Sequence, residues 1–238
     1  MKESRMKISL IIPTRSRPEE LRSTLGAAYR TAMFSAEVEA VCRLDADDPR
    51  LDDYIKVLHE FPQAVFIIGQ RRGGYSSLVE FMDECAAIST GDLIMCFNDD
   101  MVMLTSGWDE VLCRALAGRP LAVGIGELML NGDPGNQCQY ACAVIPRPLY
   151  QLCGALGLGG LNELDRCWEA LARHAGCEVK TSVQIAHRQN FTSTPDTNAV
   201  RNEYGRKLHA NWGERSAAWE EVGRRYAALV KKQPNTDG

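Results

Sequence analysis

The stretch Asp92-Leu93-Ile94-Met95-Cys96-Phe97-Asn98-Asp99-Asp100 joins an apolar run of strand length to three polar residues. Such runs are typical of strands buried on both faces, as in the parallel sheets of α/β proteins, which bind ligands at the carboxyl ends of their strands. Two adjacent carboxylates at that position repel each other, and a divalent cation commonly offsets the repulsion. From this stretch alone, a ligand site and an acidic turn after a core strand explain the pattern equally well.

Strand-like and helix-like segments alternate before this stretch. They cover residues 7–12, 18–29, 38–44, 53–60, 65–68 and 78–88. Pro13 is expected to stop the first strand, and Ser16 and Glu19 have the spacing of a capping box for the first helix. The β-α-β-α-β-α-β order predicts an α/β fold with a mostly parallel central sheet and helices on both of its faces.

Polar loops follow three of the expected strands. Asp45 ends the second strand, Arg71 lies in a basic loop after the third, and Asp99 and Asp100 follow the fourth. Because the carboxyl ends of parallel strands open on one edge, we expect these loops to converge. The sequence therefore predicts a nucleotide-diphosphate site, with carboxylates for base, ribose and metal and arginines for phosphate. Three unrelated polar loops are the alternative.

The second half of the chain carries shorter signals. Strands are expected over 121–125, 140–145 and 178–185, a turn over 131–135, and helices over 108–118, 161–174 and 214–232. The helix over 161–174 carries Glu163 and Asp165 in its first turns. His187 closely follows the strand expected after that helix, and we expect the strand to position its side chain.

Composition excludes several classes of protein. The 238 residues carry a net charge of −4, so the chain lacks the excess of positive charge that favours nucleic-acid binding. No apolar run approaches the ~20 residues of a membrane span, which leaves only peripheral membrane contact open. Nine cysteines without a CxxC pair predict a reduced compartment, and the first strand begins too early for a signal peptide. These features predict a cytoplasmic protein.

Several catalytic motifs are absent from the sequence. The turn Pro13-Thr14-Arg15-Ser16-Arg17-Pro18 after the first strand has no glycine, which argues against a dinucleotide-binding fold. No GxxxxGK[ST], GxSxG or HExxH pattern occurs. Their absence removes P-loop NTPases and the commonest hydrolase and zinc-protease sites.

Four stretches of the chain resemble family 2 glycosyltransferases with the GT-A fold. They are residues 8–18, 44–48, 91–100 and Leu164-Asp165 with Gly176. The resemblance implies a Rossmann-like GT-A domain over 1–205, with a nucleotide-binding half over 1–125 and an acceptor and base half over 126–205. A helical tail over 206–238 would follow. It also implies inverting, metal-dependent transfer of a sugar from a nucleotide sugar to an acceptor hydroxyl.

The resemblance implies roles for individual residues. The nucleotide-binding residues would be Pro13, Thr14, Arg17, Asp45, Arg71, Asn98 and Asp99. Asp100 and His187 would hold Mn²⁺ or Mg²⁺, and Asp165 would be the general base. The chain departs from the family pattern at Asn98, where the family has the first Asp of its DxD motif. It departs again at Leu164, where the family has Glu, and this leaves Glu163 as a rival base.

The expected partners are a UDP- or GDP-linked sugar and a glycan or other hydroxyl acceptor. Two other functions stay open. A sugar-phosphate nucleotidyltransferase shares the architecture but normally has a glycine-rich loop after its first strand, which is absent here. A non-catalytic nucleotide-sugar or glycan-binding module is the other, because the DxD and base motifs are altered. Structural roles are the alternative for His187 and Asp165.

Overall fold

The computed structural model describes residues 5–73, 77–130, 139–158, 163–188, 206 and 210–233. Within these residues one sheet holds eight strands in the order β3-β2-β1-β4-β7-β6-β8-β5. They are β1 (Ile8–Thr14), β2 (Val38–Asp45), β3 (Ala64–Gly69), β4 (Leu93–Cys96), β5 (Met101–Met103), β6 (Val123–Leu130), β7 (Val144–Pro146) and β8 (Glu178–His187). Among these described strands four pairings are parallel and three antiparallel. The predicted α/β fold class is confirmed.

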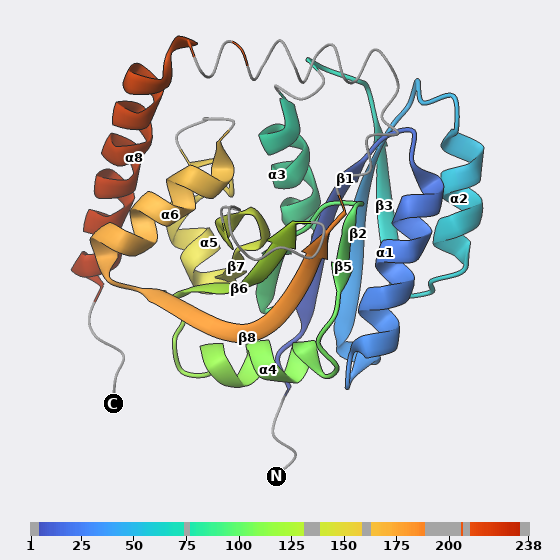
Figure 1. Ribbon diagram of the computed structural model, residues 1–238, viewed down its shortest axis with the longest axis horizontal. Helices are drawn as coiled ribbons and strands as arrows, with labels where there is room; N and C mark the ends of the chain where they lie inside the picture. The colour runs from blue at the N-terminus through green and yellow to red at the C-terminus, as the bar shows by residue number, and fades with distance from the viewer. Residues whose placement is uncertain are drawn as a thin grey trace.

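Helices cover both faces of the sheet (Figure 1). One face packs against α1 (Pro18–Thr31), α2 (Leu51–His59) and α4 (Trp108–Leu116). The other packs against α3 (Leu78–Ile88), α5 (Arg147–Cys153), α6 (Leu164–Ala175) and α8 (Trp212–Lys232). Successive residues of a strand point to opposite faces, so Leu10 and Ile12 of β1 enter the first core and Ile11 enters the second. The apolar runs of the sequence reflect this burial on both sides.

Strands β1 to β4 form the parallel half of the sheet, as the sequence predicts. Thr14 at the end of β1 lies beside Leu44, and Asp45 at the end of β2 lies beside Gly69 of β3. The loops after these strands therefore begin at one edge of the sheet. We call it the carboxyl edge, and the polar residues of three of these loops are those predicted to bind a ligand.

The start of the first loop differs from the prediction in two ways. β1 does not stop at Pro13 but continues to Thr14, with Pro13 paired to Arg43 of β2. The pairing of β1 with β4 ends at Ile11, so the missing N–H of Pro13 costs no ladder hydrogen bond on that side. The predicted capping box is also wrong, because Arg17 precedes α1 and no side chain caps the helix.

The strand predicted over 140–145 is wrong in part. Residues Gln139–Cys142 form a 3₁₀ helix, and only Val144–Pro146 form a strand, β7. The side-chain amide of Gln139 bonds both the N–H and the carbonyl of Leu128 in β6, so it takes the place that a paired strand would fill. β7 pairs with β4 on one side and, at Val144, with Gly124 of β6 on the other, so it joins the parallel half to the rest of the sheet. The predicted turn over 131–135 lies outside the described residues.

β8 brings a distant part of the chain to the carboxyl edge. It bends as it crosses the sheet (Figure 1) and pairs antiparallel with β5, with His187 opposite Met101. Arg188 then donates its N–H to the carbonyl oxygen of Asp100 at 2.8 Å. Because Met101 directly follows Asp100, this pairing sets His187 beside the carboxylates that follow β4.

The helix predicted for the tail, α8, packs along α6. A Cβ placed on Gly223 of α8 would lie 2.4 Å from the Cβ of Ala170, so only glycine allows this close approach. No helix in the described ranges is long and apolar enough to cross a bilayer. The domain boundaries expected near residues 125 and 205 stay predictions.

Candidate functional site

Asp99 is buried at the carboxyl edge and held by the loop that follows β1. Its side chain is 1% exposed. Oδ2 accepts a hydrogen bond from the Thr14 hydroxyl at 2.6 Å, and Oδ1 lies 2.7 Å from a guanidinium nitrogen of Arg17. The Thr24 hydroxyl of α1 donates to the carbonyl oxygen of Asp99 at 2.7 Å. The structure therefore joins Thr14, Arg17 and Asp99, which the sequence predicts to act together.

Asp100 extends the same cluster. Its Oδ2 accepts a hydrogen bond from Arg17 at 3.2 Å. Its Oδ1 is buried and accepts no hydrogen bond from the described residues, although Nε2 of His187 lies 3.2 Å away. Burial raises the pKa of Asp99 to about 6. Burial also opposes ionisation of Asp100, but His187 and Arg17 outweigh it and lower the pKa of that carboxyl.

The surroundings of Asp100 fit a divalent cation. Buried polar atoms are normally hydrogen-bonded, so a buried carboxylate oxygen without a donor suits the role of a metal ligand. Mg²⁺ and Mn²⁺ accept carboxylate oxygens, and Mg²⁺ in particular completes its shell with substrate phosphates and water. No group of three His, Cys, Asp or Glu side chains in the described ranges forms a complete metal site. Binding of a cation by Asp100 and His187 stays a prediction.

Asp45 is fixed by two arginines. Arg43 is 2% exposed, pairs with Oδ1 of Asp45 and lies 4.0 Å from the centre of the Phe81 ring on α3. Arg15 approaches from the loop after β1, 2.9 Å from Oδ2. The sequence analysis does not identify Arg43 as a site residue. A charged residue inside a strand buried on both faces needs a buried partner, and this is the signal that points to Arg43.

Tyr54 and Asp48 shape the loop that carries Arg17. The Tyr54 hydroxyl lies 2.8 Å from Oγ1 of Thr14 and accepts the N–H of Arg17 at 2.7 Å. Asp48 accepts the N–H of Ser16 at 2.7 Å, and Ser16 has a φ of +61°, which is uncommon for a residue with a side chain. This conformation takes the place of the predicted capping box. Sequence reasoning does not single out Tyr54 or Asp48, because their partners lie far away in the chain.

The other predicted nucleotide-binding residues surround this cluster. Pro13 and Asn98 are half-buried beside Thr14 and Asp99 in the chain. Arg71 is exposed in the loop after β3. The bond from Arg15 lowers the pKa of Asp47, and Arg71 is close enough to add to the effect. The predicted residues thus share the carboxyl edge, and their binding role stays a prediction.

Glu163 and Asp165 lie at the start of α6 in different surroundings. Glu163 is 6% exposed, and its carboxylate is held by Arg215 and, at 3.2 Å, by the indole N–H of Trp219, both on α8. Asp165 is half-buried in the first turn of α6. Burial raises the pKa of the Cys96 thiol at the end of β4, and Asp165 is near enough to add to that rise. Asp165 therefore lies towards the carboxyl edge, whereas Glu163 faces the tail helix.

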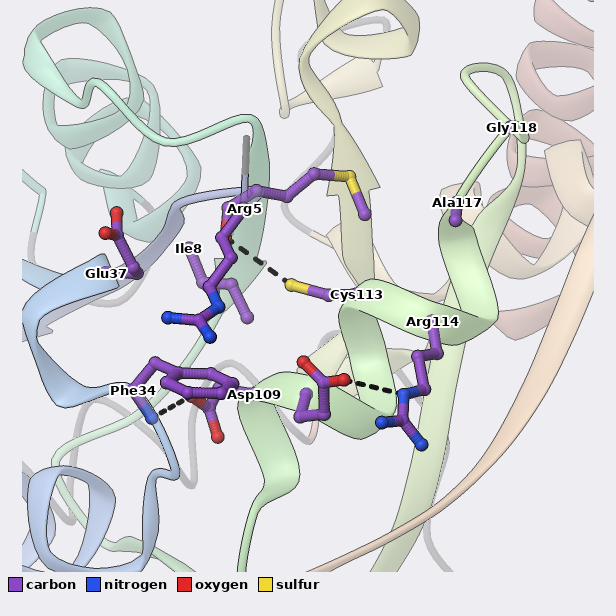
Figure 2. Close-up of a pocket in the computed structure, with 11 residues that line it drawn as sticks. Arg5, Ile8, Phe34, Glu37, Asp109, Cys113, Arg114, Ala117 and Gly118 are labelled. Atoms are coloured by element: carbon purple, nitrogen blue, oxygen red, sulfur yellow. Dashed lines mark hydrogen bonds and ion pairs between the residues drawn. The ribbon is translucent and has the colours of Figure 1, made fainter. Parts of the chain in front are cut away.

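A cavity of about 410 Å³ lies at the opposite edge of the sheet (Figure 2). Its lining includes Ile8, the first residue of β1, and none of the residues predicted for the site. Asp109 in this cavity accepts the N–H of Phe34 at 2.7 Å. Arg114 donates to Glu110 at 2.6 Å. These charged groups bond to one another and to the backbone. We therefore regard the carboxyl edge as the better candidate for the functional site.

The fold is similar to that of TarS from S. aureus. A crystal structure of TarS residues 1–349 matches with a TM-score of 0.62 and 10% identity, over 77% of this chain and 60% of TarS. The structure of the same TarS fragment in complex with UDP matches with a TM-score of 0.61 and 10% identity, over 81% of this chain and 62% of TarS. The chain thus spans about 60% of the TarS chains that it matches. No protein-family model and no curated protein matches the sequence.

Proposed function

We propose that this protein is an inverting, metal-dependent glycosyltransferase that moves a sugar from a nucleotide sugar to an acceptor hydroxyl. The observation that carries the proposal is the clustering of Thr14, Arg17, Asp99 and Asp100 at one sheet edge, with Asp45 on the neighbouring strand. TarS, which shares the fold, has been solved in complex with UDP. The sequence resemblance to family 2 glycosyltransferases supports the same function.

Asp45 is the residue that we assign to the nucleobase or ribose. Arg43 contacts Oδ1 and Arg15 contacts Oδ2, so the carboxylate is oriented before a ligand arrives. Each carboxylate oxygen has a second lone pair, which leaves Asp45 able to accept further hydrogen bonds. The UDP complex of TarS favours a uridine donor, and a GDP-linked donor is the alternative.

The diphosphate would lie beside Arg17, Asp99 and Asp100. Arg17 contacts both carboxylates, so its guanidinium would lie close to the phosphate charge of a diphosphate bound there. Asp100 and His187 would hold Mn²⁺ or Mg²⁺. A cation bound there would neutralise charge on the departing nucleoside diphosphate.

Asp165 is the general base in this proposal. It would take the proton from the acceptor hydroxyl while that oxygen attacks the anomeric carbon from the side opposite the diphosphate. Glu163 suits the role less well, because Arg215 and Trp219 already hold its carboxylate against α8. Attack from the opposite side inverts the anomeric configuration.

A cytoplasmic location is part of the proposal. The described cysteines are free, and most of them are buried among apolar side chains. Burial raises the pKa of these thiols, as at Cys153 and Cys167, to about 12. Neutral buried thiols of this kind act as small apolar side chains, which supports a reduced compartment.

A donor screen tests the proposed function. Thermal shift is measured with Mn²⁺ across UDP-, GDP- and dTDP-sugars, and release of the nucleoside diphosphate is then followed for the donor that stabilises the protein most. The proposal predicts stabilisation by one nucleotide class and slow release of its diphosphate. Stabilisation without release by any donor would favour a non-catalytic binding module. Pyrophosphate release from a nucleoside triphosphate and a sugar phosphate would favour a nucleotidyltransferase.

A further inference from the structure

A second cleft lies between α6 and α8. Its volume is about 220 Å³. The charged and aromatic residues that line it are Arg166, Glu169 and Arg173 of α6 and Trp212, Trp219 and Glu220 of α8. Asp165 is the residue directly before Arg166. The cleft lies on the side of α6 that faces the tail helix, and it begins one residue after the proposed catalytic base in the chain.

Trp212 presents an aromatic surface to this cleft. Trp212 is 45% exposed, and Trp is enriched among the residues that dominate binding interfaces. The ring meets Trp219 edge to face, with centroids 5.2 Å apart and an interplanar angle of 82°. Trp219 is itself 6% exposed and donates its indole N–H to Glu163. The exposed ring of Trp212 is thus braced by a buried one, which fixes its orientation.

The charges that line the cleft balance one another. Arg166 lies 2.9 Å from Glu169, and Arg173 pairs with Glu220. The two arginines and two glutamates leave no net charge, so the cleft offers little field to attract a phosphate or a cation. Glu220 also bonds Nε2 of His174 at 2.7 Å through its other oxygen, and each carboxylate oxygen can accept more than one hydrogen bond. This lining suits a neutral ligand that carries many hydroxyl groups and one apolar face.

We propose that the cleft binds a neutral sugar ring of the acceptor, stacked on Trp212. The inference rests on the proposed function, because Asp165 would deprotonate a hydroxyl of the same acceptor. The volume is smaller than the ~300–1,000 Å³ of pockets that enclose a drug-sized ligand. It therefore fits one ring, with the rest of the glycan outside. The hydroxyl groups of the ring would bond to the Arg166–Glu169 and Arg173–Glu220 pairs.

The test measures binding of four neutral trisaccharides to the full chain by ligand-observed NMR. The probes are cellotriose, maltotriose, mannotriose and chitotriose. We expect saturable binding of at least one of them, weakened about tenfold or more in Trp212→Ala, as for truncation of a central aromatic residue in an interface. Trp212→Phe keeps an aromatic face and is expected to retain most of the affinity.

Ser216 and Ala217 provide a matched pair of variants that leave Trp212 in place. Ser216 lines the cleft, whereas Ala217 is exposed next to it on α8 and is not part of the lining. Ser216→Phe fills the cleft and is expected to abolish trisaccharide binding. Ala217→Phe adds the same ring outside the cleft and is expected to leave binding unchanged. Equal binding by both variants would overturn the proposal.

UDP binding with Mn²⁺ is measured on the same preparations, and this separates the two proposals. UDP binding without binding of any trisaccharide would overturn the acceptor cleft and leave the proposed function standing. Trisaccharide binding that depends on Trp212, without UDP binding, would support the cleft as a sugar site and contradict the proposed function. Binding of both, with UDP affinity equal in Trp212→Ala and wild type, is the result that we expect.

Discussion

Glu39 and Asp100 are both carboxylates of one sheet, but the chain treats them differently. Glu39 near the start of β2 is 7% exposed, and both of its oxygens have partners. Oε1 accepts from the Ser9 hydroxyl and the Thr90 N–H, each at 2.5 Å, and Oε2 lies 2.6 Å from Nζ of Lys7. Oδ1 of Asp100 at the carboxyl edge is buried and accepts no hydrogen bond from the described residues, although Nε2 of His187 lies 3.2 Å away.

The pKa values separate Glu39 from Asp99, the neighbour of Asp100, whereas the pKa of Asp100 is lowered like that of Glu39. Burial disfavours the charged form of Glu39, but the bonds from Lys7, Ser9 and Thr90 outweigh it and lower the pKa to about 2. At Asp99 burial prevails over Arg17 and raises the pKa to about 6. A carboxylate that the chain satisfies contributes to folding. A buried carboxyl group whose charged form is disfavoured, as the raised pKa of Asp99 indicates, is typical of a functional site.

The largest effect is expected at the proposed base. Asp165→Asn removes the proton acceptor and keeps the shape of the side chain, so transfer should fall by ~10²–10⁴-fold. UDP affinity should stay close to wild type, because Asp165 lies outside the nucleotide cluster. Initial rates with the donor found by screening measure the effect.

Glu163→Gln is the matched control for the base. It weakens the contact with Arg215 and should lower stability more than it lowers the transfer rate. If Glu163→Gln loses transfer while Asp165→Asn keeps it, Glu163 is the base and our assignment is wrong.

The next largest effect is expected at Glu39, as a loss of unfolding free energy. Glu39→Ala leaves the partners Ser9, Thr90 and Lys7 without their acceptor and should cost about 3 kcal/mol of unfolding free energy. UDP affinity should not change, because Glu39 lies at the opposite edge of the sheet. Urea unfolding and calorimetric titration measure the two quantities. A loss of UDP affinity with unchanged stability would contradict the structural role assigned to Glu39.

A pH profile of stability gives a smaller effect. The pKa of Glu39 lies below its ordinary value of 4.5, so its contribution is fully present above that pH and is lost as the pH falls towards 2. The loss should be on the order of 2 kcal/mol, reduced from the full linkage value because the group is only partly buried. Glu39→Gln should lack this part of the profile. An identical profile in wild type and variant would show that Glu39 does not titrate as described.

The smallest effect is expected at Arg71. Its side chain is exposed, so any contact with the nucleotide diphosphate is screened by water, and Arg71→Ala should weaken UDP binding only about threefold. Lys56→Ala is the control, since Lys56 is also exposed but lies on α2. Calorimetric titration with UDP and Mn²⁺ measures both. Equal affinity of the two variants would remove Arg71 from the site.

Much of the parallel half could be predicted from the sequence because its signals are local. β4 appears as an apolar run and β2 as an alternation of apolar and charged residues, Asp45 is the last residue of β2, and Asp99 and Asp100 come shortly after β4. The 140–145 segment could not be predicted correctly, because a single side chain, Gln139, replaces strand pairing with β6. No local pattern reveals such a substitution.

The partners of the supporting residues of the site could not be predicted from local sequence. Arg43 gains its role from Phe81 and Asp45, and Tyr54 from Thr14 and Arg17, through contacts that exist only in the fold. His187 could be suggested by the family resemblance, but its place beside Asp100 depends on the β5–β8 pairing.

The central claim is that Asp100 at the carboxyl edge anchors a metal that binds together with a nucleoside diphosphate. Calorimetric titration of UDP with and without Mn²⁺, on wild type and on Asp100→Ala, tests it most directly. We predict that Mn²⁺ tightens UDP binding by about tenfold or more in wild type and has no effect in a folded Asp100→Ala variant. Equal UDP affinity with and without Mn²⁺ in wild type, or the same Mn²⁺ effect in the variant, would contradict the account.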